Sequence, residues 1–151
     1  MRKGLVLGGM VLGVVGLLAL GTSPAMAAPG NNGDIHVVTT TNPDGTPGCA
    51  FDLQFSDFDP GALTSTVTFS LQAPTQGTVA DPFATRSVSF TGGPGLDATA
   101  TLDLSTELLA SGAQPEDGAY HVKVDTATPF SNGSDGKSKV FWVGACVIIP
   151  S

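Results

Sequence analysis

Apolar and polar residues alternate with a period of two along most of the chain after residue 33. The pattern is clearest in "CAFDLQFS" (49–56), where Phe51, Leu53 and Phe55 alternate with small or polar residues. Such alternation is typical of strands with one buried and one solvated face. It predicts seven strands, at 34–40, 49–56, 63–72, 86–91, 97–104, 119–126 and 138–147.

Turn-forming residues separate these segments. Clusters of Gly, Pro, Asn and Asp occur at 42–48, 59–61, 91–95, 115–118 and 131–136. No segment has a sustained helical stripe, and "STELLASG" (105–112) predicts one helical turn in a crossing loop. Short strands in succession favour an all-β fold, an antiparallel sandwich of about seven strands, over a parallel α/β sheet. We expect one such domain over residues 34–149.

The first 27 residues have the features of a secretory signal peptide. A basic start, "MRK", precedes the apolar stretch Gly4–Leu20, and Ala25 and Ala27 stand at the −3 and −1 places of a cleavage site. An uncleaved membrane anchor is the alternative, although the apolar stretch is short for a span. Cleavage leaves a flexible leader (28–33) before the domain. We therefore expect a secreted protein without a membrane span, either free or retained at the cell envelope.

The exported chain is strongly acidic. The full chain has 6 basic and 13 acidic residues, and two of the basic ones, Arg2 and Lys3, leave with the signal peptide. Four basic and thirteen acidic residues remain, a net charge of −9. Nucleic acid and anionic lipid surfaces would repel such a chain. High solubility is the plain interpretation of this charge.

Two cysteines, Cys49 and Cys146, remain after cleavage. In an oxidising compartment they are expected to form one disulfide. The seven-strand order supports this pairing, because the start of the second strand and the end of the seventh lie at the same end of a sandwich. A metal site is the alternative, but two cysteines are too few for a closed zinc site. We expect no metal and no cofactor.

The final strand, within "KVFWVGACVIIPS" (139–151), is apolar on both faces. If Cys146 faces the core, so does Trp142, and Phe141 and Val143 lie on the outer face. Cover by the leader or by a loop would explain this, a candidate surface for a partner is the alternative, and a local error in the assumed register is a third explanation.

The segment "EDGAYHVKV" (116–124) resembles the tyrosine corner of immunoglobulin-like domains in the placement of Asp117 and Tyr120, and this resemblance implies an antiparallel immunoglobulin-like sandwich. The chain also resembles a group of small secreted actinobacterial proteins, mostly uncharacterised. The likeness rests on "GDIHVV", "CAFDLQFSDFDPG", "EDGAYHVKV" and "KSKVFWVGAC". It implies a secreted β-domain with one disulfide, and no activity. Several such proteins continue past the final cysteine into a wall-sorting tail. This sequence departs from that pattern, so the resemblance does not imply covalent attachment to the wall.

Candidate catalytic and metal-binding residues are few. His36 and His121 fall on predicted wet faces, so solvated histidines are more plausible than a metal pair. Asp57 and Asp59 lack the spaced ligand run of a calcium loop. Glu116 and Asp117 are expected to shape the corner rather than to act as an acid/base pair. Asn132-Gly133-Ser134 fits a glycosylation sequon and equally fits an ordinary turn.

These observations favour a non-enzymatic secreted or envelope-associated module with a binding or structural role. Its partner would be a protein or an envelope component. The alternative is a small-molecule carrier that resembles the apoproteins of enediyne antibiotics, which also use an acidic sandwich but have two disulfides. A secreted hydrolase or metal enzyme is a third hypothesis, and it lacks a motif in this sequence, such as the G-x-S-x-G elbow.

Overall fold

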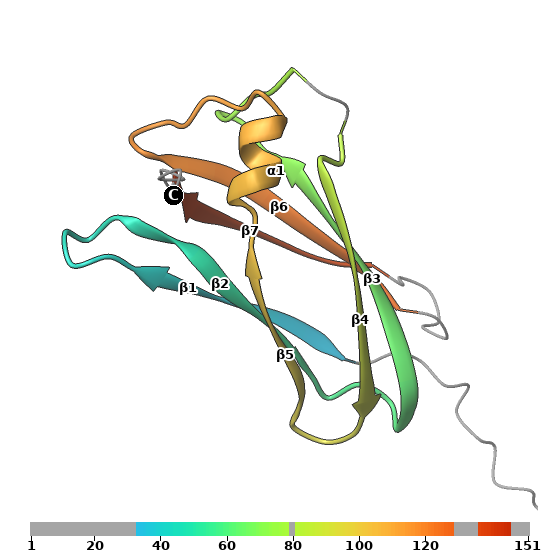
Figure 1. Ribbon diagram of the computed structural model, residues 1–151. Helices are drawn as coiled ribbons and strands as arrows, with labels where there is room; N and C mark the ends of the chain where they lie inside the picture. Colours follow the sequence, from blue (N-terminus) through green and yellow to red (C-terminus); the bar gives the residue numbers. More distant parts are fainter. Residues whose placement is uncertain (1–32, 79–80, 129–135, 146–151) are drawn as a thin grey trace, which may run out of the picture.

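The computed structural model describes residues 33–78, 81–128 and 136–145. These residues form seven strands and one short helix (Figure 1). The elements are β1 (Asp34–Thr41), β2 (Pro47–Ser56), β3 (Gly61–Leu71), β4 (Ala84–Gly92), β5 (Leu96–Asp103), α1 (Ser105–Ala110), β6 (Ala119–Ala127) and β7 (Gly136–Gly144). The predicted all-β architecture of seven strands is confirmed, with every strand within about three residues of its predicted bounds.

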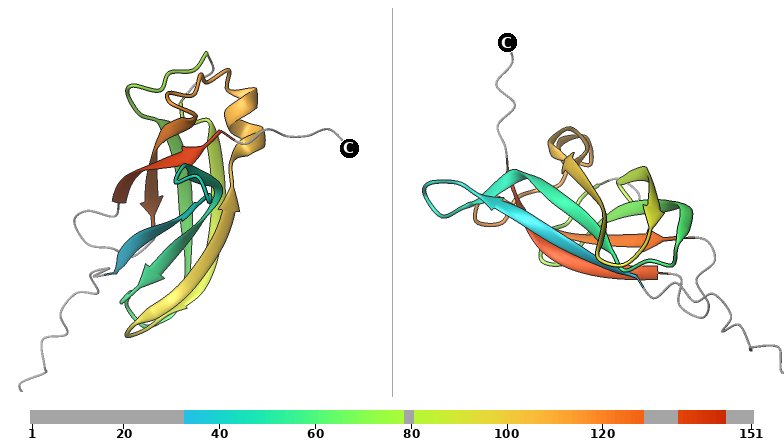
Figure 2. Two further views of the ribbon diagram at one scale, coloured as in Figure 1. Left: turned by 90° about the vertical axis from the view of Figure 1, so that its left-hand side faces the viewer. Right: turned by 90° about the horizontal axis from the view of Figure 1, so that it is seen from below.

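The strands form two antiparallel sheets that pack face to face (Figure 2). One sheet has the order β1-β2-β5 and the other β4-β3-β6-β7. Each strand therefore hydrogen-bonds mainly to strands that run in the opposite direction. The edge strands of the second sheet are β4 and β7, and β7 is the strand on which the candidate partner surface was predicted.

The core lies between the sheets and includes many of the apolar residues that the alternation predicted as buried. Phe51, Leu53 and Phe55 of β2 oppose Val67 and Phe69 of β3, all at or near zero exposure. Burial of one such side chain contributes about 1.5–3 kcal/mol, so these alternate positions dominate the stability of the sandwich. The helix α1 adds Leu108 to this core at one end (Figure 1).

Tight turns connect the strands where the sequence has Gly and Asp. The β6 strand is preceded by a two-residue turn in which Asp117 and Gly118 have φ of 49° and 79°. Glu116 and Ala119 exchange backbone hydrogen bonds of 2.8 and 3.0 Å across this turn. Positive φ at both central residues is the geometry that favours Asp-Gly in such turns. The turn fixes where the Glu116 and Asp117 side chains begin.

Candidate functional site

The two faces of β7 are the reverse of those predicted. Phe141 and Val143 are 8% and 1% exposed and belong to the core, whereas Val140 and Trp142 are 49% and 37% exposed. The prediction that Phe141 and Val143 form a partner surface is therefore wrong. The apolar outer face that motivated it exists, but it consists of Val140 and Trp142.

The error arose because the strand face was counted back from Cys146. The strand β7 ends at Gly144, so residue 146 is no basis for assigning the faces of this strand. Gly144 is itself buried, and a side chain there would collide with the backbone carbonyl of Pro47. The end of β7 therefore lies against the start of β2. Cys146 lies outside the described residues, so its pairing with Cys49 stays a prediction, which this proximity supports.

Trp142 is conspicuous because, apart from its β7 neighbour Val140, this sheet face is mostly polar. The outward positions of β3 and β4 are mostly Ser and Thr, among them Thr64, Thr66, Ser87 and Ser89. The outward positions of β6 are His121, Lys123 and Asp125, all half-buried. A large aromatic ring on such a face exposes apolar surface to water, which makes it a candidate contact for a ligand.

The Trp142 ring is held in place by His121, its cross-strand partner. The two rings stack with centroids 4.5 Å apart and planes inclined by 16°. The imidazole Nδ1 is 2.5 Å from the carbonyl oxygen of Ala73, and the His121 backbone N–H donates to Thr75 Oγ1 at 2.8 Å. One face of the indole is thus covered by a fixed ring. Because β7 is an edge strand, Trp142 has a cross-strand neighbour in its sheet on one side only.

A pocket of about 250 Å³ lies beside Trp142 at this end of the sandwich. It is lined by Pro47, Glu116, Asp117, Ala119 and Trp142. Its walls therefore combine an indole and two small apolar residues with two carboxylates, both on exposed residues. We call this the Trp142 pocket. Sequence reasoning placed Glu116 and Asp117 in a turn but did not associate them with Trp142.

The tyrosine corner predicted for Asp117 and Tyr120 stays a prediction. Tyr120 is half-buried and packs against the core. Within the described residues, no hydrogen bond from its hydroxyl group is present. Asp117 acts locally through its positive φ, as described above. The role of Asp117 that the geometry displays is to shape the turn and to line the Trp142 pocket.

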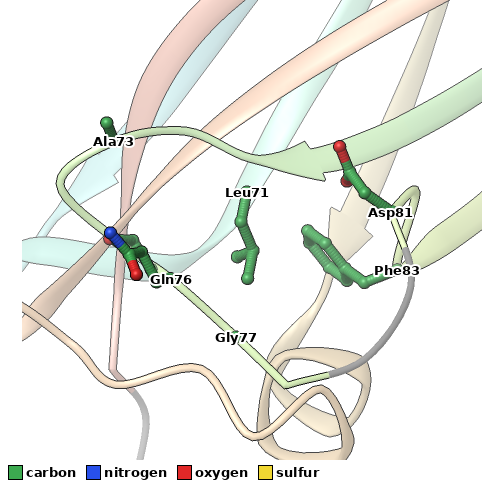
Figure 3. Close-up of a pocket in the computed structure, with 7 residues that line it drawn as sticks. Leu71, Ala73, Gln76, Gly77, Asp81 and Phe83 are labelled. Carbon is green, nitrogen blue, oxygen red and sulfur yellow. The ribbon is translucent and has the colours of Figure 1, made fainter.

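A second pocket, of about 320 Å³, lies between the end of β3 and the loop that leads to β4. In the view of Figure 3, Leu71 lies between Phe83 and Gln76, and Asp81 lies on the same side as Phe83. Ala73, Thr75 and Gly77 complete the lining. This loop pocket adjoins the Trp142 face through His121, which contacts both Ala73 and Thr75.

The other candidate residues form no common site. His36 is exposed on β1, whereas His121 stacks on Trp142 of the other sheet. Asp57 Oδ1 accepts a hydrogen bond of 2.8 Å from the Gly95 backbone, so it braces two loops. Asp59 Oδ2 is buried and has no hydrogen-bond partner among the described residues. No group of three or more metal-ligating side chains occurs in the described ranges.

Ala25, Ala27 and the sequon Asn132-Gly133-Ser134 lie outside the described residues, so the signal peptide and the glycosylation site stay predictions. None of the helices in the part of the chain that the structure describes is long and apolar enough to cross a membrane. No protein-family model matches the sequence, and no similar curated protein was found. The surface around Trp142 is therefore the feature from which a function can be inferred.

Proposed function

We propose that this chain is a secreted or cell-envelope-associated, non-enzymatic module of immunoglobulin-like type that binds its partner through the surface around Trp142. The order of the strands in the two sheets supports the immunoglobulin-like type. If β1 to β7 are lettered A, B, C, C′, E, F and G in chain order, the two sheets have the orders A-B-E and C′-C-F-G. Immunoglobulin-like domains divide their strands between the sheets in a similar way. The signal-peptide pattern supports export.

One observation carries the proposed binding role: the single tryptophan of the chain is exposed, held by a stacked histidine and next to a pocket. Tryptophan is enriched among the residues that dominate binding energy at protein interfaces, because its large rigid ring loses little entropy on binding. The partner is expected to be a protein or an envelope component, as the sequence indicated.

The exported protein itself offers a direct test. Purified protein would be mixed with washed cell envelopes of its host, and the bound fraction compared between wild type and Trp142→Ser. We expect the variant to lose most of the bound fraction while its unfolding midpoint stays close to that of wild type. Equal binding by the variant would show that this surface is not the one used. The control Thr64→Ala changes the same sheet face far from Trp142 and should bind as wild type does.

The compartment needs its own measurement. The intact mass of the native protein would be determined from culture fluid and from washed envelope, with and without reduction before thiol alkylation. We expect a chain that begins at Ala28 and is alkylated twice only after reduction. A mass that still contains residues 1–27 would contradict cleavage, and alkylation without reduction would contradict the disulfide.

A second candidate function is a secreted small-molecule carrier, and the loop pocket favours it. Its volume of about 320 Å³ is at the lower end of the range of about 300–1,000 Å³ for ligand sites, and Leu71 and Phe83 provide an apolar floor. Native mass spectrometry of protein purified from the host would test this function. A co-purifying small molecule lost from Phe83→Asp but not from Trp142→Ser would favour the carrier over the binding module.

A further inference from the structure

The geometry points to an aliphatic ammonium group as the ligand of the Trp142 pocket. This inference rests on the proposed binding function and specifies its chemistry. The group could belong to a lysine side chain of a polypeptide or to a small amine. Both present a positive charge next to methyl or methylene groups, and three features of the pocket match that combination.

The first feature is the indole face. Trp142 is one of the residues that line the pocket, and the stack with His121 covers one face of its ring. The face of an aromatic ring carries negative electrostatic potential and attracts a cation within about 6 Å of the ring centre, most strongly for tryptophan. Because His121 fixes the ring, an incoming cation does not have to immobilise it.

The second feature is a pair of uncompensated carboxylates. Glu116 and Asp117 line the same pocket, and the turn between Glu116 and Ala119 fixes their backbone. Neither residue forms an ion pair with any residue that the structure describes, whereas the three ion pairs there involve other acids. Two negative charges at one pocket favour a cation and repel an anion.

The third feature is the apolar part of the wall. Pro47 and Ala119 provide small apolar surfaces next to the charged rim. A hydrocarbon stem next to an ammonium group can bury its methylenes there and keep its charge at the carboxylates. The volume of about 250 Å³ suits one side chain rather than a large ligand. The net charge of −7 for the full chain adds long-range attraction for a cation.

The fluorescence of Trp142 can report binding directly because the chain has one tryptophan. The purified exported protein would be titrated with Nα-acetyl-lysinamide, with choline, and with the neutral analogue Nα-acetyl-norleucinamide at constant ionic strength. We expect a saturable change with the two cations and none with the neutral analogue. A larger response to choline would identify a small quaternary amine as the better ligand, and a larger response to the lysine compound a side chain. A saturable change of equal midpoint with the neutral analogue would overturn the inference.

Charge variants sharpen the test. The double change Glu116→Gln and Asp117→Asn removes both charges and keeps side-chain size, and asparagine tolerates the positive φ at residue 117. We expect affinity for Nα-acetyl-lysinamide to fall about tenfold or more. Asp81→Asn, in the loop pocket, also neutralises a carboxylate and should leave affinity within about twofold. An equal loss in both variants would mean that overall charge, not this pocket, attracts the ligand.

The two proposals can fail separately. If Trp142→Ser abolishes envelope binding but neither cation changes the fluorescence, the binding function stands and the ammonium ligand is wrong. If Trp142→Ser binds envelopes normally, the proposed function is wrong, whatever the cations do. Competition of either cation with envelope binding by wild type would support both proposals together.

Discussion

The two faces of β7 differ in what they contact. Phe141 and Val143 point into the sandwich, where the Phe141 ring lies 4.7 Å from that of Phe51. Val140 and Trp142 point outward from the same backbone, and Trp142 contacts a histidine ring and an open pocket. One face therefore contributes mainly to stability, and the other is available for binding.

Because of this difference, neighbouring residues of β7 have different roles, one in folding and the next in the proposed binding. Successive side chains of a strand point to opposite faces, so neighbouring positions in β7 can be changed for different purposes. A substitution on the inner face should change the free energy of unfolding, and one on the outer face should change binding.

The largest effect is expected for Phe141→Ala, which empties a packed aromatic site in the core. Loss of a buried phenylalanine typically costs about 3–5 kcal/mol of the free energy of unfolding. Val140→Ala, one residue away and half exposed, should change it by less than about 0.5 kcal/mol. Urea unfolding of both variants followed by far-UV circular dichroism would measure these values. Similar losses in the two variants would contradict the assignment of the faces.

The next effect concerns the end of β7. Replacement of Cys49 and Cys146 by serine should lower the free energy of unfolding by about 2–4 kcal/mol, because the predicted disulfide closes a loop of about 97 residues. Calorimetric unfolding of the variant and of reduced wild type would measure the loss. The two proteins should unfold at similar temperatures. An unchanged midpoint in both would show that Cys49 and Cys146 are not linked.

The alternation predicted the strands but not the faces of the last one. A period of two is visible when one face is buried and the other wet, as in β2 and β3, and there the predicted core residues are buried. In "VFWVGA" (140–145) both faces of the strand are apolar, so the pattern does not show which of them is buried. The buried face therefore had to be inferred from Cys146. Assigning Phe141 and Val143 to the core would have left Trp142 as the exposed residue.

The Trp142 pocket could not be derived from the sequence. Its lining residues come from β2, from the turn before β6 and from β7. Pro47, Glu116 and Trp142 are far apart in the sequence, and no sequence pattern indicates that they lie close together in the fold. The cross-strand pairing of His121 with Trp142 depends on the register between β6 and β7. The sequence predicted the strands on which this site is built, whereas the packing of the two sheets decides which side chains meet.

Gly144→Ala should have an intermediate effect. A side chain at this position would meet the carbonyl of Pro47 and the backbone of Gly48, so the end of β7 would have to move away from β2. Forcing extra atoms into a packed site typically costs about 1–3 kcal/mol. Thermal unfolding would measure the loss. Gly45→Ala is not a suitable control because Gly45 has a φ of 85°, at which any side chain is strained. Ala62→Ser, at an exposed position of β3, serves instead and should change the unfolding temperature little.

The smallest effect belongs to the outer face and depends on pH. Desolvation raises the pKa of Asp125, but the hydrogen bond from Ser138 and the ion pair with Lys123, 3.0 Å away, outweigh it and hold this pKa below the ordinary value. A lowered folded-state pKa stabilises the protein above the unfolded-state pKa of about 3.9, and the contribution is lost as pH falls through the folded-state value.

Ser138→Ala should therefore destabilise the protein by about 0.5 kcal/mol at neutral pH, since the pair is partly exposed and screened by solvent. This difference from wild type should decrease as the pH is lowered from about 5 to about 2, because protonation removes the charge that the hydroxyl group stabilises. Urea unfolding at a series of pH values would measure it, with Ser87→Ala as a control on the same sheet face. A difference that is constant with pH would show that Ser138 acts through packing alone. The outer face of β7 would then contribute to stability in the same way as the inner one, and the separation of the two faces would be weaker than we propose.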